Sequence, residues 1–122
     1  MWEVRFADEF DAEVDCLDEA VQDALYAAAQ VLEQRGPHLG RPHADTLNGS
    51  RYANMKELRF TAADGVWRVA FAFDPDRAAI LLIAGDKAGV RESRFYTRLI
   101  ETADARFGRH LQRRLRYGSD TS

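Results

Sequence analysis

The sequence is poor in cysteine and has no long hydrophobic run. Its single cysteine, Cys16, cannot form a disulfide bond within the chain. No apolar run approaches the roughly 20 residues that a helix needs to cross a bilayer, and the acidic start of the sequence lacks the apolar stretch of a secretion signal. His38 and His43 have no partner at the spacing of a metal site. These absences predict a cytoplasmic protein without a membrane partner, and they suggest neither a metal nor another cofactor.

The length and composition are those of one small globular domain. The chain has 122 residues, of which 46% are hydrophobic, enough to bury one modest core. No linker or internal repeat divides the sequence. We therefore expect a single domain over residues 1–118, followed by a disordered tail at 119–122.

Positive and negative charges are unevenly distributed along the chain. Residues 1–50 hold 3 basic and 11 acidic side chains, a net charge of −8, whereas residues 51–122 hold 14 basic and 9 acidic ones, a net charge of +5. This asymmetry predicts an acidic or polyanionic partner for the second half. The net charge of −3 for the whole chain argues against a general nucleic-acid coat, so any nucleic-acid binding should be local.

Hydrophobic periodicity predicts six elements in the order β-α-β-β-β-α. A strand over 2–6 is followed by a helix from about 11 to 34, whose apolar residues recur at three- and four-residue steps. The later elements are strands over 52–60, 66–73 and 78–85 and a closing helix over 92–117, which Gly108 could end early. The short links between the three strands predict an antiparallel meander. The fold class is therefore α+β, a small antiparallel sheet with helices packed on one face.

Charged residues interrupt the strands in "NMKELRFTAADGVWRVAF", residues 54–71. Because side chains alternate across a strand, parity sorts them into two faces. The core face is predicted to hold Leu58, Phe60, Trp67 and Val69. The other face is predicted to hold Glu57, Arg59 and Arg68. Lys56 has the parity of the core face, but it lies near the strand start, where a long side chain can reach solvent.

An ordinary structural explanation stays open for each of these charges. Glu–Arg pairs on a half-exposed sheet contribute only about 0.2–1 kcal/mol and need no function. Lys87 could solvate the turn after the last strand, and Tyr96 could pack in the core. Arg68 is the least ordinary residue, because it sits between two residues that should be buried.

Three segments occur together in the order and spacing of a known family: "GRPHADTLNGSRYANMKELRF", "GVWRVAFAFDPDRAAILLIAGDKAG" and "FYTRLIETAD". With them the chain resembles the RelE/HigB-like toxins of bacterial type II toxin–antitoxin systems, in particular their phage-derived, gene product 49-like branch. The resemblance covers most of residues 1 to about 112. It implies the RelE/ParE-like fold, a toxin function, and a cognate antitoxin that is a small helix-turn-helix protein.

The resemblance also implies an activity, that of a metal-independent mRNA endoribonuclease acting at the ribosomal A site. Such enzymes direct the RNA 2′-hydroxyl at the adjacent phosphate and leave a 2′,3′-cyclic phosphate and a 5′-hydroxyl. The reaction needs a base near the 2′-oxygen, cations around the phosphate and an acid for the leaving oxygen. Carried over position by position, the resemblance assigns Glu57 as base, Arg59 and Arg68 as phosphate and transition-state cations, Lys87 as a further phosphate contact or acid, and Tyr96 as an orienting ring. Lys56, Arg91 and Arg94 are the further RNA-binding candidates.

Two features depart from the family pattern. Many RelE-type relatives have Lys where this chain has Glu57, so a carboxylate would have to serve as base. The pI of about 5.6 is low for a ribosome-dependent nuclease.

Two alternatives therefore stay open: a ParE-like toxin directed at gyrase, and a catalytically inactive, phage-derived protein that retains only antitoxin binding.

Overall fold

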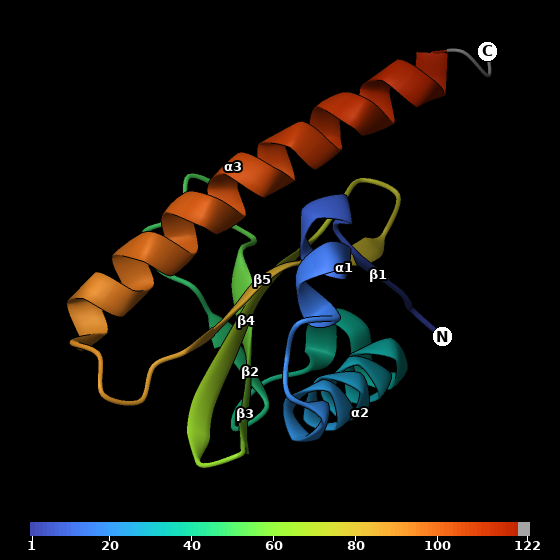
Figure 1. Ribbon diagram of the computed structural model, residues 1–122. Helices are drawn as coiled ribbons and strands as arrows, with labels where there is room; N and C mark the ends of the chain where they lie inside the picture. The colour runs from blue at the N-terminus through green and yellow to red at the C-terminus, as the bar shows by residue number, and fades with distance from the viewer. Residues whose placement is uncertain (120–122) are drawn as a thin grey trace.

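The computed structural model describes the backbone of residues 1–119 and the side chains of residues 1–116. In chain order the elements are β1 (Glu3–Phe6), α1 (Asp8–Val14), α2 (Glu19–Arg35), the 3-10 turn η1 (Gly36–His38), β2 (Ala44–Thr46), β3 (Lys56–Ala62), β4 (Gly65–Phe73), β5 (Ala78–Asp86) and α3 (Glu92–Ser119) (Figure 1). Residues 120–122 of the predicted tail lie outside the described part of the chain, and Ser119 is the last residue of α3. No helix within residues 1–119 combines the length and apolar character that a membrane span requires.

The sheet has five strands in the order β1-β5-β4-β3-β2. The predicted meander is confirmed, because β3, β4 and β5 pair antiparallel through short turns. The sheet as a whole is mixed, because β1 lies parallel to β5. The three-residue strand β2 pairs with the start of β3, in a segment where the sequence indicated only a loop. A strand of three residues is too short to show an alternating pattern.

Helices cover both faces of the sheet. Cross-strand partners share a face and neighbours along a strand do not. Leu58 therefore faces α2, where it lines a shallow apolar hollow with Ala28 and Val31, whereas Glu57 faces α3, where Tyr96 contacts it. Figure 1 shows α2 and α3 on opposite sides of the sheet. The α+β class and the order of elements are thus confirmed, but the expectation that the helices pack on one face is corrected.

The predicted helix over residues 11–34 is two helices. It breaks between Val14 and Glu19, where Asp18 has extended backbone angles and precedes the first turn of α2. Asp is a favoured residue at such a helix start. The apolar periodicity did not reveal the break, because buried Val14 and Val21 and partly buried Leu17 keep the same spacing on both sides of it.

Helix α3 has an apolar half and a charged half. The apolar half packs on the sheet through residues four positions apart, namely Phe95, Leu99, Ala103 and Phe107, all at most 8% exposed. Gly108 does not end the helix; it allows the Tyr52 hydroxyl to lie 3.1 Å from where a Cβ would stand. Beyond this point α3 is held mainly by ion pairs. The first half thus belongs to the core, where each fully buried large apolar side chain contributes about 1.5–3 kcal/mol.

Candidate functional site

Glu57 is at the centre of the charged cluster on the α3 face of the sheet. Its position in the middle of three paired strands buries it, and only 5% of its surface is exposed. Its Oε1 atom accepts a hydrogen bond of 3.1 Å from the Tyr96 hydroxyl. Its Oε2 atom is buried and has no hydrogen-bond partner among the described residues. The two oxygens of this carboxylate are therefore in different environments.

Two arginines flank the Glu57 carboxylate. Arg59 and Arg68 are direct cross-strand partners, and the Nε atom of each lies 3.6 Å from Glu57 Oε1. Arg68 is only 6% exposed and donates from Nη1 to the Trp67 carbonyl at 2.9 Å. Its Nε group is buried and has no hydrogen-bond partner in the described part of the chain. Strand parity predicted that these three residues share a face, and the strand register brings them together.

Tyr96 and Lys87 cover the cluster from the side of α3. Tyr96 lies in the first turns of α3, with its ring against that of Phe95. Lys87 follows β5, places its ammonium 5.8 Å from the centre of the Tyr96 ring, and forms an ion pair of 3.2 Å with Glu92. Tyr96 thus contacts Glu57 directly, whereas Lys87 reaches the cluster only through Tyr96.

Burial raises the pKa of the Glu57 carboxyl above its ordinary value. The hydrogen bond from Tyr96 and the charges of Arg68 and Arg59 oppose this effect, because each stabilises the ionised carboxylate. Burial also raises the pKa of the Tyr96 hydroxyl, so the hydroxyl keeps its proton and remains a donor. A carboxyl with a raised pKa can both take up and release a proton closer to neutral pH than an ordinary glutamate.

A hollow of about 580 Å³ opens beside this cluster, and we call it the Glu57 hollow. It is lined by Arg41, Asp45, Thr46, Leu47, Asn48, Glu57, Arg59, Glu92, Ser93 and Tyr96. The residues from β2 and its flanks were missed by the sequence analysis. Only the pairing of β2 with β3 brings them to Glu57, and no motif in "HADTLN" indicated that pairing.

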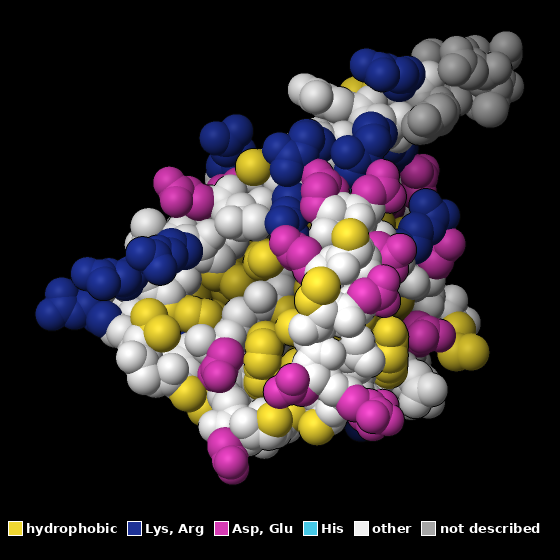
Figure 2. All heavy atoms as spheres, viewed as in Figure 1, with side chains coloured by type: hydrophobic (Ala, Val, Ile, Leu, Met, Phe, Trp, Pro, Cys, Tyr) yellow, Lys and Arg dark blue, Asp and Glu magenta, His cyan; other side chains and the backbone are white. Residues whose placement is uncertain are grey.

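The three further RNA-binding candidates do not form one patch. Lys56 lies on the opposite face of β3 from Glu57 and donates to the Pro37 carbonyl at 3.1 Å. It therefore does not join the Glu57 cluster. Arg91 and Arg94 are exposed at the start of α3 and have no hydrogen bond or ion pair through a side chain within residues 1–116. Figure 2 shows Lys and Arg side chains gathered along α3.

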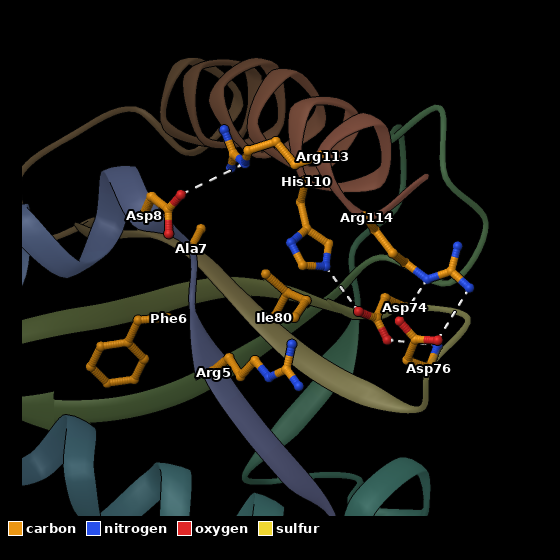
Figure 3. A pocket seen from close by; sticks show the side chains of 10 residues that line it. All are labelled: Arg5, Phe6, Ala7, Asp8, Asp74, Asp76, Ile80, His110, Arg113 and Arg114. Carbon is orange, nitrogen blue, oxygen red and sulfur yellow. Dashed lines mark hydrogen bonds and ion pairs between the residues drawn. The ribbon is translucent and has the colours of Figure 1, made fainter. Parts of the chain in front are cut away.

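A second hollow, of about 470 Å³, lies between α3 and the turn joining β4 to β5 (Figure 3). Asp74, at its edge, accepts the backbone N–H groups of Asp76 and Ala78 and lies 2.8 Å from Nε2 of His110. Arg114 pairs with Asp76 at 2.7 Å. These charges already satisfy one another, so the hollow reads as a fastening of α3 to the turn rather than as a binding site.

The Glu57 cluster has the parts that phosphate-ester chemistry requires. Glu57 can exchange a proton, and the guanidinium groups of Arg59 and Arg68 suit phosphate oxygens because each presents several N–H donors in a plane. The Tyr96 ring offers a surface against which a base or ribose can rest. In the hollow of Figure 3, by contrast, Arg113 pairs with Asp8 and Arg114 with Asp76, and no buried side-chain polar atom described there lacks a hydrogen-bond partner.

Comparison with known proteins gives consistent results. The family model described as "Phage derived protein Gp49-like" matches residues 12–108. Two proteins of Mycobacterium tuberculosis are similar to the chain. The candidate toxin HigB2 is 48% identical over 96 residues, which are 78% of this chain and 47% of that protein. The candidate toxin HigB3 is 49% identical over 83 residues, 68% of this chain and 70% of that protein. The chain thus spans about half the length of HigB2.

A solved structure shares the fold. The free state of a double mutant of the E. coli toxin RelE superimposes with a TM-score of 0.58, covering 81% of this chain and 93% of RelE. The sequences are 11% identical in this comparison, so the likeness concerns the fold alone.

Proposed function

The chain belongs to the Gp49-like family of HigB-type, RelE-like toxins, and from this premise we propose that it is the toxin of a toxin–antitoxin pair and acts as an mRNA endoribonuclease. In this proposal it works in the cytoplasm at the ribosomal A site, without a metal, and a cognate helix-turn-helix antitoxin neutralises it. The names of the relatives support a toxin. The ribonuclease activity is supported by the geometry of the Glu57 cluster.

One observation carries the proposal: the two buried side-chain polar atoms without a hydrogen-bond partner in the described residues are Glu57 Oε2 and Arg68 Nε. A buried polar group without a hydrogen bond costs about 1–3 kcal/mol. RNA cleavage needs both kinds of group, since the carboxylate oxygen can accept a proton from a 2′-hydroxyl and the guanidinium N–H can donate to a phosphate oxygen. A substrate would therefore satisfy both atoms.

The proposed reaction balances with the residues of the site. The Glu57 carboxylate takes the proton of the 2′-hydroxyl, the 2′-oxygen forms a bond to phosphorus, and the bond from phosphorus to the 5′-oxygen breaks. Arg59 and Arg68 stabilise the negative charge on the phosphate oxygens. The leaving 5′-oxygen takes a proton from Lys87. The products are a 2′,3′-cyclic phosphate and a 5′-hydroxyl, and solvent returns Glu57 and Lys87 to their starting protonation states.

Access to the site requires side-chain movement. Glu57 and Arg68 are almost fully buried, although Glu57 lines the Glu57 hollow together with Arg59 and Tyr96. We propose that RNA displaces the Tyr96 hydroxyl from Glu57 Oε1 and that the Tyr96 ring then orients the substrate. The hydrogen bond that would be lost is neutral-to-charged and about 3.1 Å long, so its loss costs on the order of 1.5–3 kcal/mol.

The test is induction in bacteria that lack the antitoxin, with the 5′ ends of cellular RNA mapped. We expect growth arrest and new 5′-hydroxyl ends with the unaltered protein, and neither with Glu57→Gln or Arg68→Ala. Arg109→Ala, which changes a surface arginine paired with Glu9, is the matched control and should still cleave.

Other outcomes would contradict the proposal. A DNA-damage response with intact transcripts would indicate a gyrase-directed toxin. Normal growth together with tight antitoxin binding would indicate an inactive binding protein.

A further inference from the structure

Asp45 lies directly across from Glu57 in the ladder between β2 and β3. Cross-strand partners project from the same face of a sheet, with Cβ atoms about 4.5–5.5 Å apart. Both side chains accordingly line the Glu57 hollow. Two carboxylates in this arrangement repel each other and destabilise the sheet, so their pairing is not explained by stability.

The Asp45 carboxylate is fixed in its ionised form. Its Oδ1 atom accepts the backbone N–H of Thr46 at 2.8 Å, and its Oδ2 atom accepts a hydrogen bond of 2.9 Å from Arg41 Nε. The Thr46 N–H, followed by the Arg41 side chain, lowers the pKa of Asp45. The side chain is 30% exposed, but both oxygens are engaged, so the negative charge beside Glu57 stays in place.

Charged groups from every neighbouring element face Glu57. Arg59 on β3, Arg68 on β4 and the Tyr96 hydroxyl on α3 favour its ionised form, whereas Asp45 on β2 favours its neutral form. Arg41 and Glu92 also line the hollow. The Lys87 ammonium lies 5.8 Å from the centre of the Tyr96 ring. Asp45 is the acidic neighbour whose charge acts on Glu57 in the same direction as burial.

We propose that Asp45 is a positioning residue of this site, acting through Glu57: its fixed carboxylate sets how readily Glu57 exchanges the proton of the cleavage reaction. The role in cleavage rests on the proposed function. Without Asp45, the balance between burial and the two arginines would shift toward the ionised form of Glu57 and make the carboxylate a weaker base. Two carboxylates with different surroundings can divide the work in this way, one remaining ionised while the other exchanges protons.

The first test titrates Glu57 directly by NMR, with isotope-labelled glutamate side chains, in the unaltered protein and in Asp45→Asn. The amide oxygen of Asn can still accept from the Thr46 N–H, so the local fold should be kept. We expect the midpoint of the Glu57 titration to move to lower pH in Asp45→Asn. Asp76→Asn is the matched control, because it removes another arginine-paired aspartate from the other hollow, and there the midpoint should not move.

The second test measures the pH dependence of RNA cleavage by the same variants. The acidic limb of the profile should move to lower pH in Asp45→Asn, with a reduced rate at its plateau, and Asp45→Glu should restore both. An unchanged Glu57 midpoint in Asp45→Asn would overturn the proposal. Absence of cleavage by the unaltered protein would instead overturn the proposed function, and the NMR titration would still decide whether Asp45 controls Glu57.

Discussion

Single residues determine the chemistry of the site, and Glu57 is the clearest case. Its raised pKa has two consequences that run in opposite directions with pH. Activity that needs the ionised carboxylate falls as the pH drops through the raised pKa. The folded state, in contrast, loses stability as the pH rises through that pKa, because ionisation is less favourable in the fold than in the unfolded chain. The charge that the proposed reaction uses is thus one that the fold disfavours.

The substitution Tyr96→Phe removes the hydroxyl of Tyr96 and keeps its ring, so it distinguishes the role of one from the role of the other. The hydroxyl lowers the pKa of Glu57, so its removal should raise that pKa and leave less base at neutral pH. We expect kcat/KM for RNA cleavage at neutral pH, which reports the free protein, to fall about tenfold, and the deficit to shrink as the pH rises. Tyr26→Phe is the control, since Tyr26 is exposed and stacks on Phe6. A deficit that does not depend on pH would contradict this account.

The sequence predicted some residues of the site and missed others for identifiable reasons. Strand parity is a local property, so the sequence alone predicts that Glu57, Arg59 and Arg68 share one face, as they do in the structure. Asp45 was missed because its position depends on a three-residue strand. The resemblance assigned Lys56 to the RNA site, although its parity predicted the other face of the strand. In the structure Lys56 lies on that other face, away from Glu57.

At the scale of elements, α3 is attached to α1 by a line of ion pairs, which we call the α1–α3 seam. Its members are Glu13 with Arg106, Glu9 with Arg109, and Asp8 and Glu9 with Arg113. Arg106 is the best-buried cation of the seam: its two Nη atoms lie 2.7 Å from the two Glu13 oxygens, and Nη1 also donates to the Leu82 carbonyl at 2.8 Å.

Alanine substitutions along the seam should therefore have unequal effects. Arg106→Ala should lower the free energy of unfolding by about 2 kcal/mol, because it removes charged hydrogen bonds from a side chain that is only 12% exposed. Arg109→Ala, at a side chain that is 51% exposed, should change it by less than about 1 kcal/mol. Urea denaturation at neutral pH measures both, and equal effects would contradict the distinction.

The seam also shows why the elements were only partly predictable. Apolar periodicity located the long helices and the three central strands. It could not show on which side of the sheet α3 packs, because that face includes Glu57 and Arg68 as well as apolar residues. Contacts such as Arg106 with Glu13 join positions 93 residues apart, and no local pattern encodes them.

At the scale of the whole molecule, the charges that are unevenly distributed along the chain are partly paired within the fold and partly left exposed. The seam neutralises acids of the first half with arginines of the second, inside the fold. The start of α3 is different, since Arg91, Arg94 and Arg98 have no side-chain hydrogen bond or ion pair within residues 1–116. In the proposed function, these three arginines are available to an RNA backbone.

Arg94→Ala combined with Arg98→Ala should weaken RNA binding through charge alone. Each lost phosphate contact should make the slope of log affinity against log salt concentration shallower by about 0.7 for a single strand. Fluorescence anisotropy of a labelled single-stranded RNA measures this, with Glu57→Gln as background to prevent cleavage. Arg109→Ala with Arg113→Ala is the control pair, because both arginines are already engaged by Glu9. An equal change in slope for the two pairs would contradict the assignment.

The parallel pairing of β1 with β5 has a consequence for how the chain assembles during translation. The hairpins from β3 to β5 can form as they are synthesised, but β1 must wait for β5, and Glu13 must wait for Arg106. Arg106 follows Glu13 by 93 positions, which at ~5–20 residues per second is a delay of about 5–20 seconds. Tyr96 follows Glu57 by 39 positions, so the Glu57 cluster can be completed only after Tyr96 has been added to the chain. In the proposed function, the ribosome that makes this chain would carry an incomplete site until Tyr96 has been added.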